Sequence, residues 1–380
     1  MKKLAIITTH PIQYNAPVFK LLAERKKIEI KVFYTWENAK EGVFDKKFGQ
    51  RVKWDIPLLE GYDYQFVKNI SKDPGTHHFK GMVNPTLVSE IENWGAKAVL
   101  IFGWNFQSHF KAMRYFKGKI PVFFRGDSHL LDEKPGIRTV LRRIWLRFVY
   151  TYIDFALYVG TNNKNYFIKH GIKENQLIFT PHSVDNQRFE DNDGQYQLKA
   201  NEWRLKLGFN EQDLVIIYVG KFDEVKNLLF LIESFKQVKG RGDIKLLFVG
   251  KGILESKMIS ISAENINYLP FHNQTLMPVV YRLGDIVVLP SKSETWGLTV
   301  NEAMACGKPV LVSDKVGCAV DLVKNNVNGK IFKSGDSGDL INILKVLDKS
   351  ELKQMGINSQ KLIAEHNFTK FALAVESAIN

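Results

Sequence analysis

The sequence predicts an α/β protein with two Rossmann-like, doubly wound domains in tandem, facing each other across a cleft. Short apolar runs alternate with amphipathic stretches, a pattern typical of parallel sheets covered by helices on both faces. The length of 380 residues favours two domains, and a hydrophobic content of 45% is enough for a sizeable core. A polar stretch at residues 190–195 interrupts the alternation near the middle of the chain and is the expected linker.

The apolar runs before this linker have the length expected of buried strands, and helix-like segments lie between them. The expected strands are Lys3–Thr8, Glu29–Tyr34, Ala98–Phe102, Ile120–Phe124, Phe155–Val159 and Leu177–Phe179. The expected helices are Pro17–Lys27, Asn84–Trp94 and Asn162–His170, the last followed by Gly171 in a typical helix-ending position. We therefore assign residues 1–190 to the first domain.

The alternation resumes after the linker and defines a second domain over residues 191–365. Its expected strands are Leu214–Gly220, Lys245–Gly250, Asn267–Leu269, Ile286–Pro290, Pro309–Val312 and Gly329–Phe332. Residues 366–380 form a third segment, in which Asn367–Ile379 has a helical pattern and is expected to cross back onto the first domain.

Positive charge is concentrated in the first half of the chain. Residues 1–190 hold 30 Lys and Arg against 18 Asp and Glu, a net charge of +12, whereas residues 191–380 hold 23 against 22, a net charge of +1. The densest basic stretch, residues 134–153, has five basic residues, no acid and an apolar stripe at helical spacing. Such a helix can lie on an anionic membrane surface or pack its stripe on a sheet, and the sequence leaves both interpretations open.

Several other classes are excluded or disfavoured. No uncharged apolar run reaches the roughly 18 residues needed to cross a bilayer, and the apolar start lacks the length and cleavage site of a signal peptide. Cys306 and Cys318 cannot form a disulfide framework, and no Cys/His spacing suggests a zinc site. No nucleic-acid-binding motif appears, so we expect no nucleic-acid partner. The expected location is the cytoplasm, with possible peripheral attachment to the inner membrane face.

The most informative segment, residues 289–310, runs from a strand through a loop into a helix. Backbone N–H groups at a helix N-terminus bind anions well, so the region from Gly297 to Thr299 suits a diphosphate. Glu294 lies in the loop, where a carboxylate can reach sugar hydroxyls. Glu302 lies within the helix, where a carboxylate can accept both hydroxyls of a ribose. The spacing between Glu294 and Glu302 alone is uninformative. Its position between an apolar strand and a helix makes it specific.

This segment resembles the signature of retaining glycosyltransferases of family 4, which have the two-Rossmann GT-B architecture. The match covers most of residues 177–335. Residues 219–227 resemble the family loop in which a cationic pair, here Lys221 and Lys226, neutralises the donor diphosphate. Residues 248–252 resemble its Gly-x-Gly turn. The family usually has arginine where Lys221 stands, and a lysine lacks the bidentate guanidinium fork.

The resemblance implies a donor site in the second domain and an electrostatic role for its charged residues. Glu294, Lys226, Lys221 and a histidine, His129, are the catalytic candidates; Glu294 would orient the sugar and steady an oxocarbenium-like state. The expected donor-binding residues are Gly220, Lys221, Lys226, Gly250, Leu269, Phe271, Thr295, Trp296, Gly297, Leu298, Thr299 and Glu302.

The first domain is expected to bind the acceptor. Its first strand is followed by residues 10–17 instead of the glycine-rich turn of many family members, so His10 and Gln13 are candidates there. Arg125, Asp127 and His129 follow another strand, and the sequence does not decide which of them faces the donor sugar. An ordinary turn at residues 10–17 and a surface position for His129 are the alternatives.

The expected function is transfer of a sugar from a nucleoside-diphosphate sugar, UDP- or GDP-linked, to a glycan or polyprenyl-diphosphate-linked acceptor in surface polysaccharide or glycolipid synthesis. No cofactor and no metal are implied. The Asp-x-Asp at residues 191–193 lies in the expected linker and is interpreted as solvated loop.

Other functions remain open. A GT-B protein of another reaction type, such as an epimerase, or a non-catalytic nucleotide-sugar binder would share the donor site. A pyridoxal-phosphate phosphorylase lacks support in the sequence, and a dehydrogenase is disfavoured because no G-x-G-x-x-G follows Lys3–Thr8. The hypothesis that the protein is a basic adaptor for membranes or nucleic acids is supported by its charge alone.

Overall fold

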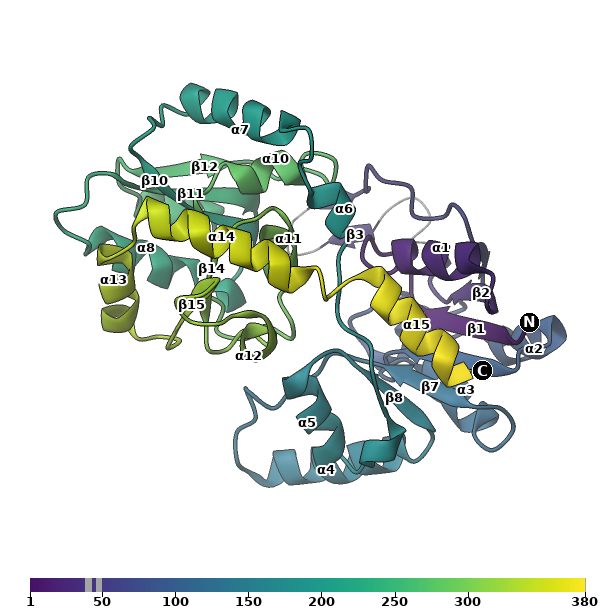
Figure 1. The fold of residues 1–380 in the computed structure, drawn as a ribbon. Coiled ribbons are helices and arrows are strands. Elements are labelled where there is room, and N and C mark those ends of the chain that lie inside the picture. Colours follow the sequence, from purple (N-terminus) through teal and green to yellow (C-terminus); the bar gives the residue numbers. More distant parts are fainter. Residues whose placement is uncertain (38–42, 46–49, 380) are drawn as a thin grey trace. The chain divides into compact units, whose positions relative to one another are not determined.

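The computed structural model describes residues 1–37, 43–45 and 50–379 and divides the chain into two compact units (Figure 1). The first unit comprises Met1–Val43, Ile56–His182 and Phe368–Asn380. The second comprises Phe44–Asp55 and Ser183–Asn367. Each unit holds one parallel sheet, so the predicted α/β fold class of two Rossmann-like domains is confirmed.

The first unit is built on a seven-stranded parallel sheet in the order β5-β2-β1-β6-β7-β8-β9. Its strands are β1 (Lys3–Thr8), β2 (Glu29–Tyr34), β5 (Asp63–Phe66), β6 (Ala98–Phe102), β7 (Val122–Arg125), β8 (Phe155–Tyr158) and β9 (Leu177–Phe179). Its helices are α1 (Ala16–Arg25), α2 (Leu87–Trp94), α3 (Gln107–Phe116), α4 (Ile137–Tyr150), α5 (Thr161–Lys169) and α15 (Phe368–Ile379), with short 3₁₀ turns η2 (Phe79–Gly81) and η3 (Glu174–Gln176).

Alternate side chains of these strands enter two separate hydrophobic layers. Ala5 and Ile7 of β1 pack in the layer that also contains buried residues of α2, α3, α4 and α5. Leu4 and Ile6 point the other way, into a layer with residues of α1 and α15. A strand that is apolar on both faces is expected in a parallel sheet with helices on both sides.

Helix α15 completes the second of these layers although it is far from it in sequence (Figure 1). Phe371, Ala372 and Val375 are buried there, and α15 packs along α1. Arg25 at the end of α1 donates from Nε and Nη2 to the two carboxylate oxygens of Glu376, at 2.7 and 2.9 Å. The predicted terminal helix is therefore present, and it belongs to the first unit.

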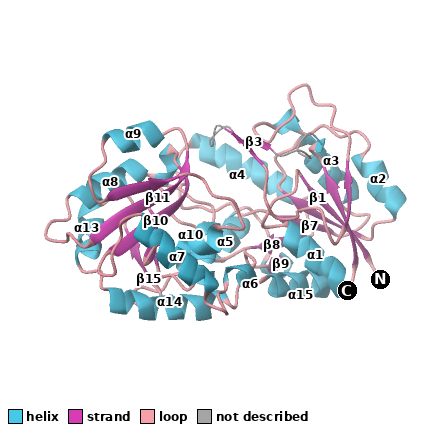
Figure 2. Ribbon diagram, turned by 90° about the horizontal axis from the view of Figure 1, so that it is seen from above, coloured by secondary structure: helices cyan, strands magenta, loops and turns pink. Residues whose placement is uncertain are grey.

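The second unit is built on a six-stranded parallel sheet in the order β12-β11-β10-β13-β14-β15, with helices on both faces (Figure 2). Its strands are β10 (Leu214–Lys221), β11 (Ile244–Lys251), β12 (Ile266–Leu269), β13 (Ile286–Leu289), β14 (Val310–Ser313) and β15 (Gly329–Phe332). Its helices are α6 (Asn186–Phe189), α7 (Gln195–Lys206), η4 (Glu224–Lys226), α8 (Leu228–Lys236), α9 (Glu255–Ser260), α10 (Met277–Arg282), α11 (Leu298–Ala305), α12 (Ala319–Leu322), α13 (Ser337–Lys345) and α14 (Lys349–Ile363). Strands β3 (Val43–Asp45) and β4 (Gln50–Val52) form a separate small sheet.

The chain passes from the first unit to the second after His182, eight residues before the boundary that the polar stretch suggested. Phe189 is fully buried in the second unit, edge-to-face with Tyr281, so the residues just before 190 already belong to that unit. The expected linker at 190–195 is in fact the turn between α6 and α7, and its last residue, Gln195, begins α7. The Asp191 carboxylate accepts from the backbone N–H groups of Tyr196 and Gln197, at 2.9 and 2.8 Å.

The interpretation of residues 191–193 as solvated loop is therefore wrong for Asp191. Its side chain is 9% exposed and lies 3.5 Å from Nε of Arg282. A carboxylate that caps a helix and faces a buried guanidinium has a structural role, and nothing in the local sequence distinguishes it from an exposed one.

The contact of α15 with α1 yields a stability prediction. Replacing Glu376 by Gln leaves the Arg25 guanidinium without its carboxylate partner in a largely buried site, so we expect a loss of about 1–3 kcal/mol in the free energy of unfolding. Urea denaturation of the full chain measures it. Lys20 and Glu24 form an exposed pair on the same helix, so Glu24→Gln is the matched control, with an expected loss under about 0.5 kcal/mol. Equal losses in the two variants would contradict the prediction.

Candidate functional site

The strand order of the second sheet fixes where its functional residues meet. Strand β10 comes first in this sheet, β11 pairs on one side of it and β13 on the other, so the order reverses between β10 and β13. In open parallel sheets, ligands bind outside the carboxyl ends of the strands at such a reversal. Lys226 and Glu294 lie in the loops that follow these two strands.

The two charged side chains form an ion pair across this reversal. Lys226 Nζ contacts Glu294 Oε2, and the side chains are 21% and 19% exposed. The backbones are joined as well, because the N–H of Lys292 donates to Val225 O at 2.8 Å. Asp223 fixes the lysine loop by accepting from the N–H groups of Val225 and Lys226, at 3.1 and 3.2 Å. The cation and the carboxylate are thus held by short, well-ordered loops.

Glycines let neighbouring loops approach at this edge. Gly220 and Gly250 are paired across β10 and β11 with φ of +152° and +148°. A Cβ on Gly250 would lie 1.9 Å from Gly220 O. No side chain fits there, so backbone alone forms this part of the edge.

The loop that carries Glu294 is anchored to the segment after β14. Glu294 bridges to Val316, its carbonyl accepts from the N–H of Gly317 at 2.9 Å, and a Cβ on Gly317 would lie 1.9 Å from Thr295 O. Ser313 Oγ donates to Ser291 O at 2.5 Å. These contacts fix the backbone position from which the Glu294 side chain extends.

Helix α11 begins beside this loop. Gly297 precedes it with φ of +97°, and the N–H groups of Leu298 and Thr299 have no acceptor within the helix, as in every first helical turn. The Trp296 side chain is buried and donates from Nε1 to Asn301 Oδ1 at 2.9 Å, so it pins the helix start. These amides form an N-terminus suited to an anion.

The other predicted donor-side residues occupy different environments. Lys221 ends β10, and its carbonyl accepts from the buried hydroxyl of Tyr218 at 2.8 Å. Leu269 ends β12 and is half-buried, as is Phe271 beyond it, whereas Thr295 is exposed. Glu302 is only 3% exposed and accepts from the Tyr281 hydroxyl at 2.5 Å. The structure therefore shows a buried hydrogen bond of Glu302 that the sequence did not indicate.

The carboxyl edge of the first sheet has its own reversal, between β1 and β6. His10 follows β1, lies 2.9 Å from Thr9 Oγ1 through Nδ1 and stands edge-on to Trp36, at 5.4 Å between ring centroids. Burial lowers the pKa of His10 to about 4, so its imidazole is neutral at pH 7. Gln13 is 9% exposed, in the turn that leads into α1.

His109 joins the strand ends at this edge, and the sequence analysis did not single it out. The ring is fully buried: Nδ1 lies 3.0 and 3.1 Å from the carbonyls of Phe102 and Gly103, after β6, and Nε2 lies 3.0 Å from Thr35 Oγ1, after β2. Two carbonyl acceptors require the proton on Nδ1, so Nε2 accepts. Burial lowers the pKa of His109 to about 4. No sequence signal marks this histidine apart from its place two residues inside a helix.

Arg125 is buried, with its guanidinium turned onto the first unit's own backbone. Its Nη1 donates to the carbonyl and hydroxyl oxygens of Thr180 at 2.9 and 2.6 Å, and its guanidinium lies 4.7 Å from the Phe371 ring centroid. Burial lowers its pKa to about 9, which leaves it charged at pH 7. These contacts give Arg125 a structural function in joining β7 to the end of β9 and to α15.

Asp127 and His129 lie just beyond β7 and are half-buried. Asp127 Oδ2 is 4.0 Å from His182 Nε2, and burial followed by the charge of Arg125 lowers the pKa of His182 to about 3. His129 Nδ1 accepts from the N–H of Leu131 at 3.2 Å. Asp127 thus faces a neutral imidazole, and the hydrogen bond between His129 and Leu131 is local.

Comparison with known families decides the class of the second unit. Residues 199–362 match the family model described as glycosyl transferases group 1. The second unit is a group 1 glycosyltransferase domain. This matched range includes Lys221, Lys226, Glu294 and Glu302, and it lies wholly within the second unit.

Curated relatives are similar to this chain over part of their length. A segment of 132 residues is 30% identical to an uncharacterized glycosyltransferase of Methanocaldococcus jannaschii, covering 33% of this chain and 34% of the relative. Another of 200 residues is 25% identical to N-acetyl-alpha-D-glucosaminyl L-malate synthase of Bacillus anthracis, covering 51% of each. The chain therefore matches about a third to a half of the length of these relatives.

Solved structures extend the similarity to the whole fold. Anabaena HepE in complex with UDP is similar over 100% of this chain and 99% of its own, with a TM-score of 0.74 and 16% sequence identity. At this identity the likeness shows the fold alone, which is GT-B, as the sequence resemblance implied. Among the residues that the structure describes, no helix has both the length and the apolar character needed to span a bilayer.

The buried His109 gives the protein a pH-dependent stability. Its pKa is about 4 in the folded protein, against an ordinary value of 6.5 for histidine, so between these values the unfolded chain binds a proton that the folded chain does not. Stability therefore rises with pH through this window, and we expect this group to cost roughly 2 kcal/mol between pH 7.5 and pH 5. Urea denaturation at the two pH values measures it. In His109→Asn, this share of the pH dependence should disappear, whatever the variant's stability at pH 7.5. An unchanged dependence would overturn the assignment.

Proposed function

We propose that this protein is a retaining glycosyltransferase that transfers a sugar from a nucleoside-diphosphate donor to a glycan or lipid-linked acceptor. The observation that carries the proposal is the ion pair of Lys226 and Glu294 across the strand reversal of a group 1 domain. A cation, a carboxylate and the amides of a helix start lie in loops at the same sheet edge. HepE, which shares the fold, has been solved with UDP and supports a uridine diphosphate donor as the first candidate.

In this mechanism, the leaving diphosphate is stabilised by Lys221, Lys226 and the first amides of α11. Electrostatic contacts of this type are typically worth about 2.7–4 kcal/mol each in the transition state. The acceptor hydroxyl attacks on the face that the diphosphate leaves, and a phosphate oxygen takes its proton, so the anomeric configuration is retained. Glu294 orients the sugar and steadies positive charge on its ring. These steps require only the diphosphate and side-chain charges, so no metal takes part in them.

The ion pair with Glu294 affects how Lys226 can bind the diphosphate. Before donor binds, the ammonium is already paired with a carboxylate, so an incoming diphosphate must share or displace this contact. The pair keeps both side chains in place at low cost, because neither charge is buried alone. Glu302, which accepts a hydrogen bond from the Tyr281 hydroxyl, is the proposed ribose ligand.

The donor assignment predicts a nucleotide-binding defect. Titration calorimetry with UDP, GDP, ADP and NAD should show saturable binding of one nucleoside diphosphate, weakened at least about tenfold in Lys226→Ala, because the remaining Glu294 carboxylate repels the diphosphate. Lys257→Ala, which removes an exposed lysine from α9 of the same unit, is the matched control and should bind as wild type. Binding of none of the diphosphates would remove the main support for the proposal.

The role of Glu294 is tested separately from binding. Glu294→Gln should keep nucleotide affinity within about threefold but lower kcat by roughly 10²–10³, the usual effect of removing one transition-state charge contact. Release of nucleotide from the sugar nucleotide, with and without acceptor, measures turnover, and NMR of the product gives its anomeric configuration. If the wild-type protein binds the nucleotide but does not turn over the sugar nucleotide, a non-catalytic sugar-nucleotide binder would be favoured. An epimerised, unreleased sugar would favour an epimerase-like reaction, and an inverted product would exclude retention.

We further propose that the acceptor is met at an anionic membrane surface through α4. Its apolar side chains do not pack on the sheet: Ile137, Leu141, Ile144, Trp145 and Phe148 are 72, 59, 61, 44 and 45% exposed. Only Leu146, Val149 and Tyr150 of this helix are buried. The helix therefore packs on the first unit through these three residues, and its apolar stripe stays largely exposed.

Basic side chains border this exposed stripe. At 100° per residue, Arg138 and Arg147 fall on opposite sides of it, and the helix contains no acid. Arg143 is partly neutralised by Glu133 at 2.7 Å, whereas Arg138, Arg142 and Arg147 are exposed. An apolar stripe between two rows of cations is the pattern of a helix that lies in the headgroup region of an anionic bilayer. The cytoplasmic, peripheral location and a polyprenyl-diphosphate-linked acceptor in surface polysaccharide synthesis fit this pattern.

Vesicle co-sedimentation tests the membrane proposal. The wild type should bind vesicles of phosphatidylglycerol at low salt and not those of phosphatidylcholine. Ile144→Glu should abolish binding, and Arg138→Gln/Arg142→Gln/Arg147→Gln should weaken it by about 100-fold, at roughly 1 kcal/mol per cation. Leu205→Glu, at a 71% exposed position of α7, is the control and should bind like wild type. Absence of binding to the anionic vesicles would sink the membrane part and leave the transferase part intact.

A further inference from the structure

The segment between β5 and α2 folds into a closed loop at the carboxyl end of β5. Asn69 holds its two ends together: Nδ2 donates to Gly81 O at 2.8 Å, and Oδ1 accepts from the N–H of Val83 at 2.9 Å. Ser71 Oγ donates to Lys80 O at 2.6 Å. A Cβ on Gly81 would lie 1.9 Å from Gly75 O, so the two sides of the loop are in backbone contact. The tip of this loop is therefore fixed by hydrogen bonds on both sides.

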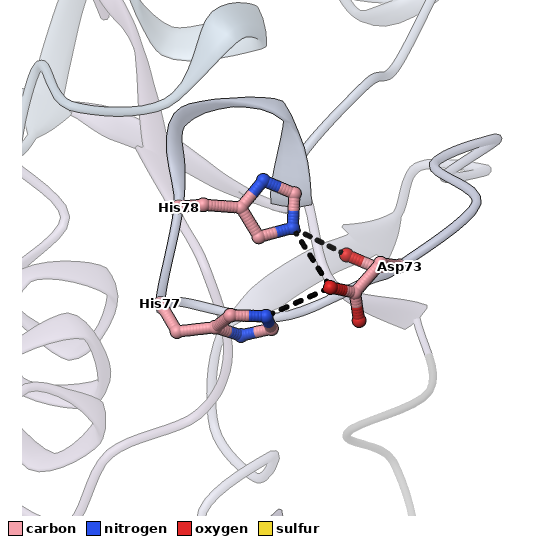
Figure 3. Close-up of side chains that lie close together, drawn as sticks. All are labelled: Asp73, His77 and His78. Carbon is pink, nitrogen blue, oxygen red and sulfur yellow. Dashed lines mark hydrogen bonds and ion pairs between the residues drawn. The ribbon is translucent and has the colours of Figure 1, made fainter.

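Three side chains converge at this tip, as Figure 3 shows. His77 Nε2 lies 2.9 Å from Asp73 Oδ2, and His78 Nε2 lies 3.3 Å from the same oxygen and 2.8 Å from the Asp73 carbonyl. One ligand atom from each residue falls within 4.8 Å of the others. The two imidazole rings are 4.6 Å apart between centroids and inclined by 66°, so they approach from different directions.

We propose that Asp73, His77 and His78 bind a divalent transition-metal ion, with Zn²⁺ as the fitting probe. Two imidazoles and one carboxylate are donors that Zn²⁺ accepts, and bonds of about 2.0–2.1 Å place tetrahedral ligand atoms roughly 3.3 Å apart. The nitrogen-to-oxygen separations here are already close to that spacing. Side-chain exposures of 70, 46 and 36% leave a fourth position open to water.

The site is prepared by the backbone around it. Asp73 and His77 are four residues apart and His78 is adjacent, so a single tight turn supplies all three ligands. Gly75 lies inside this turn, where a Cβ would come within 2.7 Å of His77 Nδ1. The search for cysteine and histidine pairs does not detect this pattern, in which an aspartate is followed four residues later by two adjacent histidines. The metal would clip the loop of residues 69–81 at the sheet edge that also carries His10 and His109, and it takes no part in the proposed transfer step.

Titration of the full chain with ZnCl₂ after chelator treatment tests the site. We expect saturable 1:1 binding at micromolar Zn²⁺, weakened at least tenfold in His77→Ala and in His78→Ala. His272→Ala, a half-buried histidine of the second unit, is the matched control and should bind like wild type. Co²⁺ should give visible absorption of four-coordinate intensity in the wild type that is absent from His77→Ala/His78→Ala.

Two results would overturn the proposal. One is the absence of saturable binding at micromolar Zn²⁺, which would make the three side chains an ion-paired cluster only. The other is binding that persists unchanged in His77→Ala/His78→Ala, which would place the metal elsewhere. Circular dichroism of the variants checks that they are folded. Neither result bears on nucleotide binding, so this site and the proposed function stand or fall separately.

Discussion

The order of strands in the two parallel sheets is the constraint on which the functional residues depend. In each sheet the first strand lies inside and later strands add on both sides, so the order reverses once in β1/β6 and once in β10/β13. The loops that follow the two strands at a reversal turn toward opposite faces of the sheet, which leaves a crevice at the carboxyl ends of these strands. In the second unit this crevice is lined by the paired charges of Lys226 and Glu294. In the first unit, His109 links the end of β6 at Phe102 to Thr35, which follows β2.

Much of the fold could be predicted, because buried parallel strands are apolar on both faces and stand out in the sequence. The bounds of β1, β2, β6, β9 and β15 agree with the apolar runs, and those of the other predicted strands differ by one or two residues. Strand β5 was missed because its residues, Asp63–Phe66, are half polar and lie at the sheet edge. The domain boundary was misplaced because a helix-capping aspartate and a linker aspartate look alike in sequence. Only the burial of Phe189 shows which side of the boundary this stretch belongs to.

The candidate site was predictable to a different degree in the two units. Lys226 and Glu294 were found because their motif is tied to strand ends, and the structure brings them together. Arg125 was grouped with the residues that could face the donor sugar because it lies at the end of a strand. In the structure, its guanidinium donates a hydrogen bond to Thr180. Helical periodicity is identical for a stripe that faces a core and one that faces a membrane, so the sequence could not decide the orientation of α4. In the structure, the residues of this stripe are exposed.

The return of α15 to the first unit has a consequence for the order of folding. The layer formed by β1, β2 and α1 is closed by Phe371, Ala372, Val375 and Ile379, which are synthesised more than 330 residues after the strands they cover. During synthesis, the whole second unit emerges from the ribosome while one face of the first sheet is still uncovered. The second unit is continuous apart from the short segment 44–55, so it can fold first. The first unit then keeps an apolar sheet face exposed, to chaperones and to other nascent chains, until α15 has been synthesised.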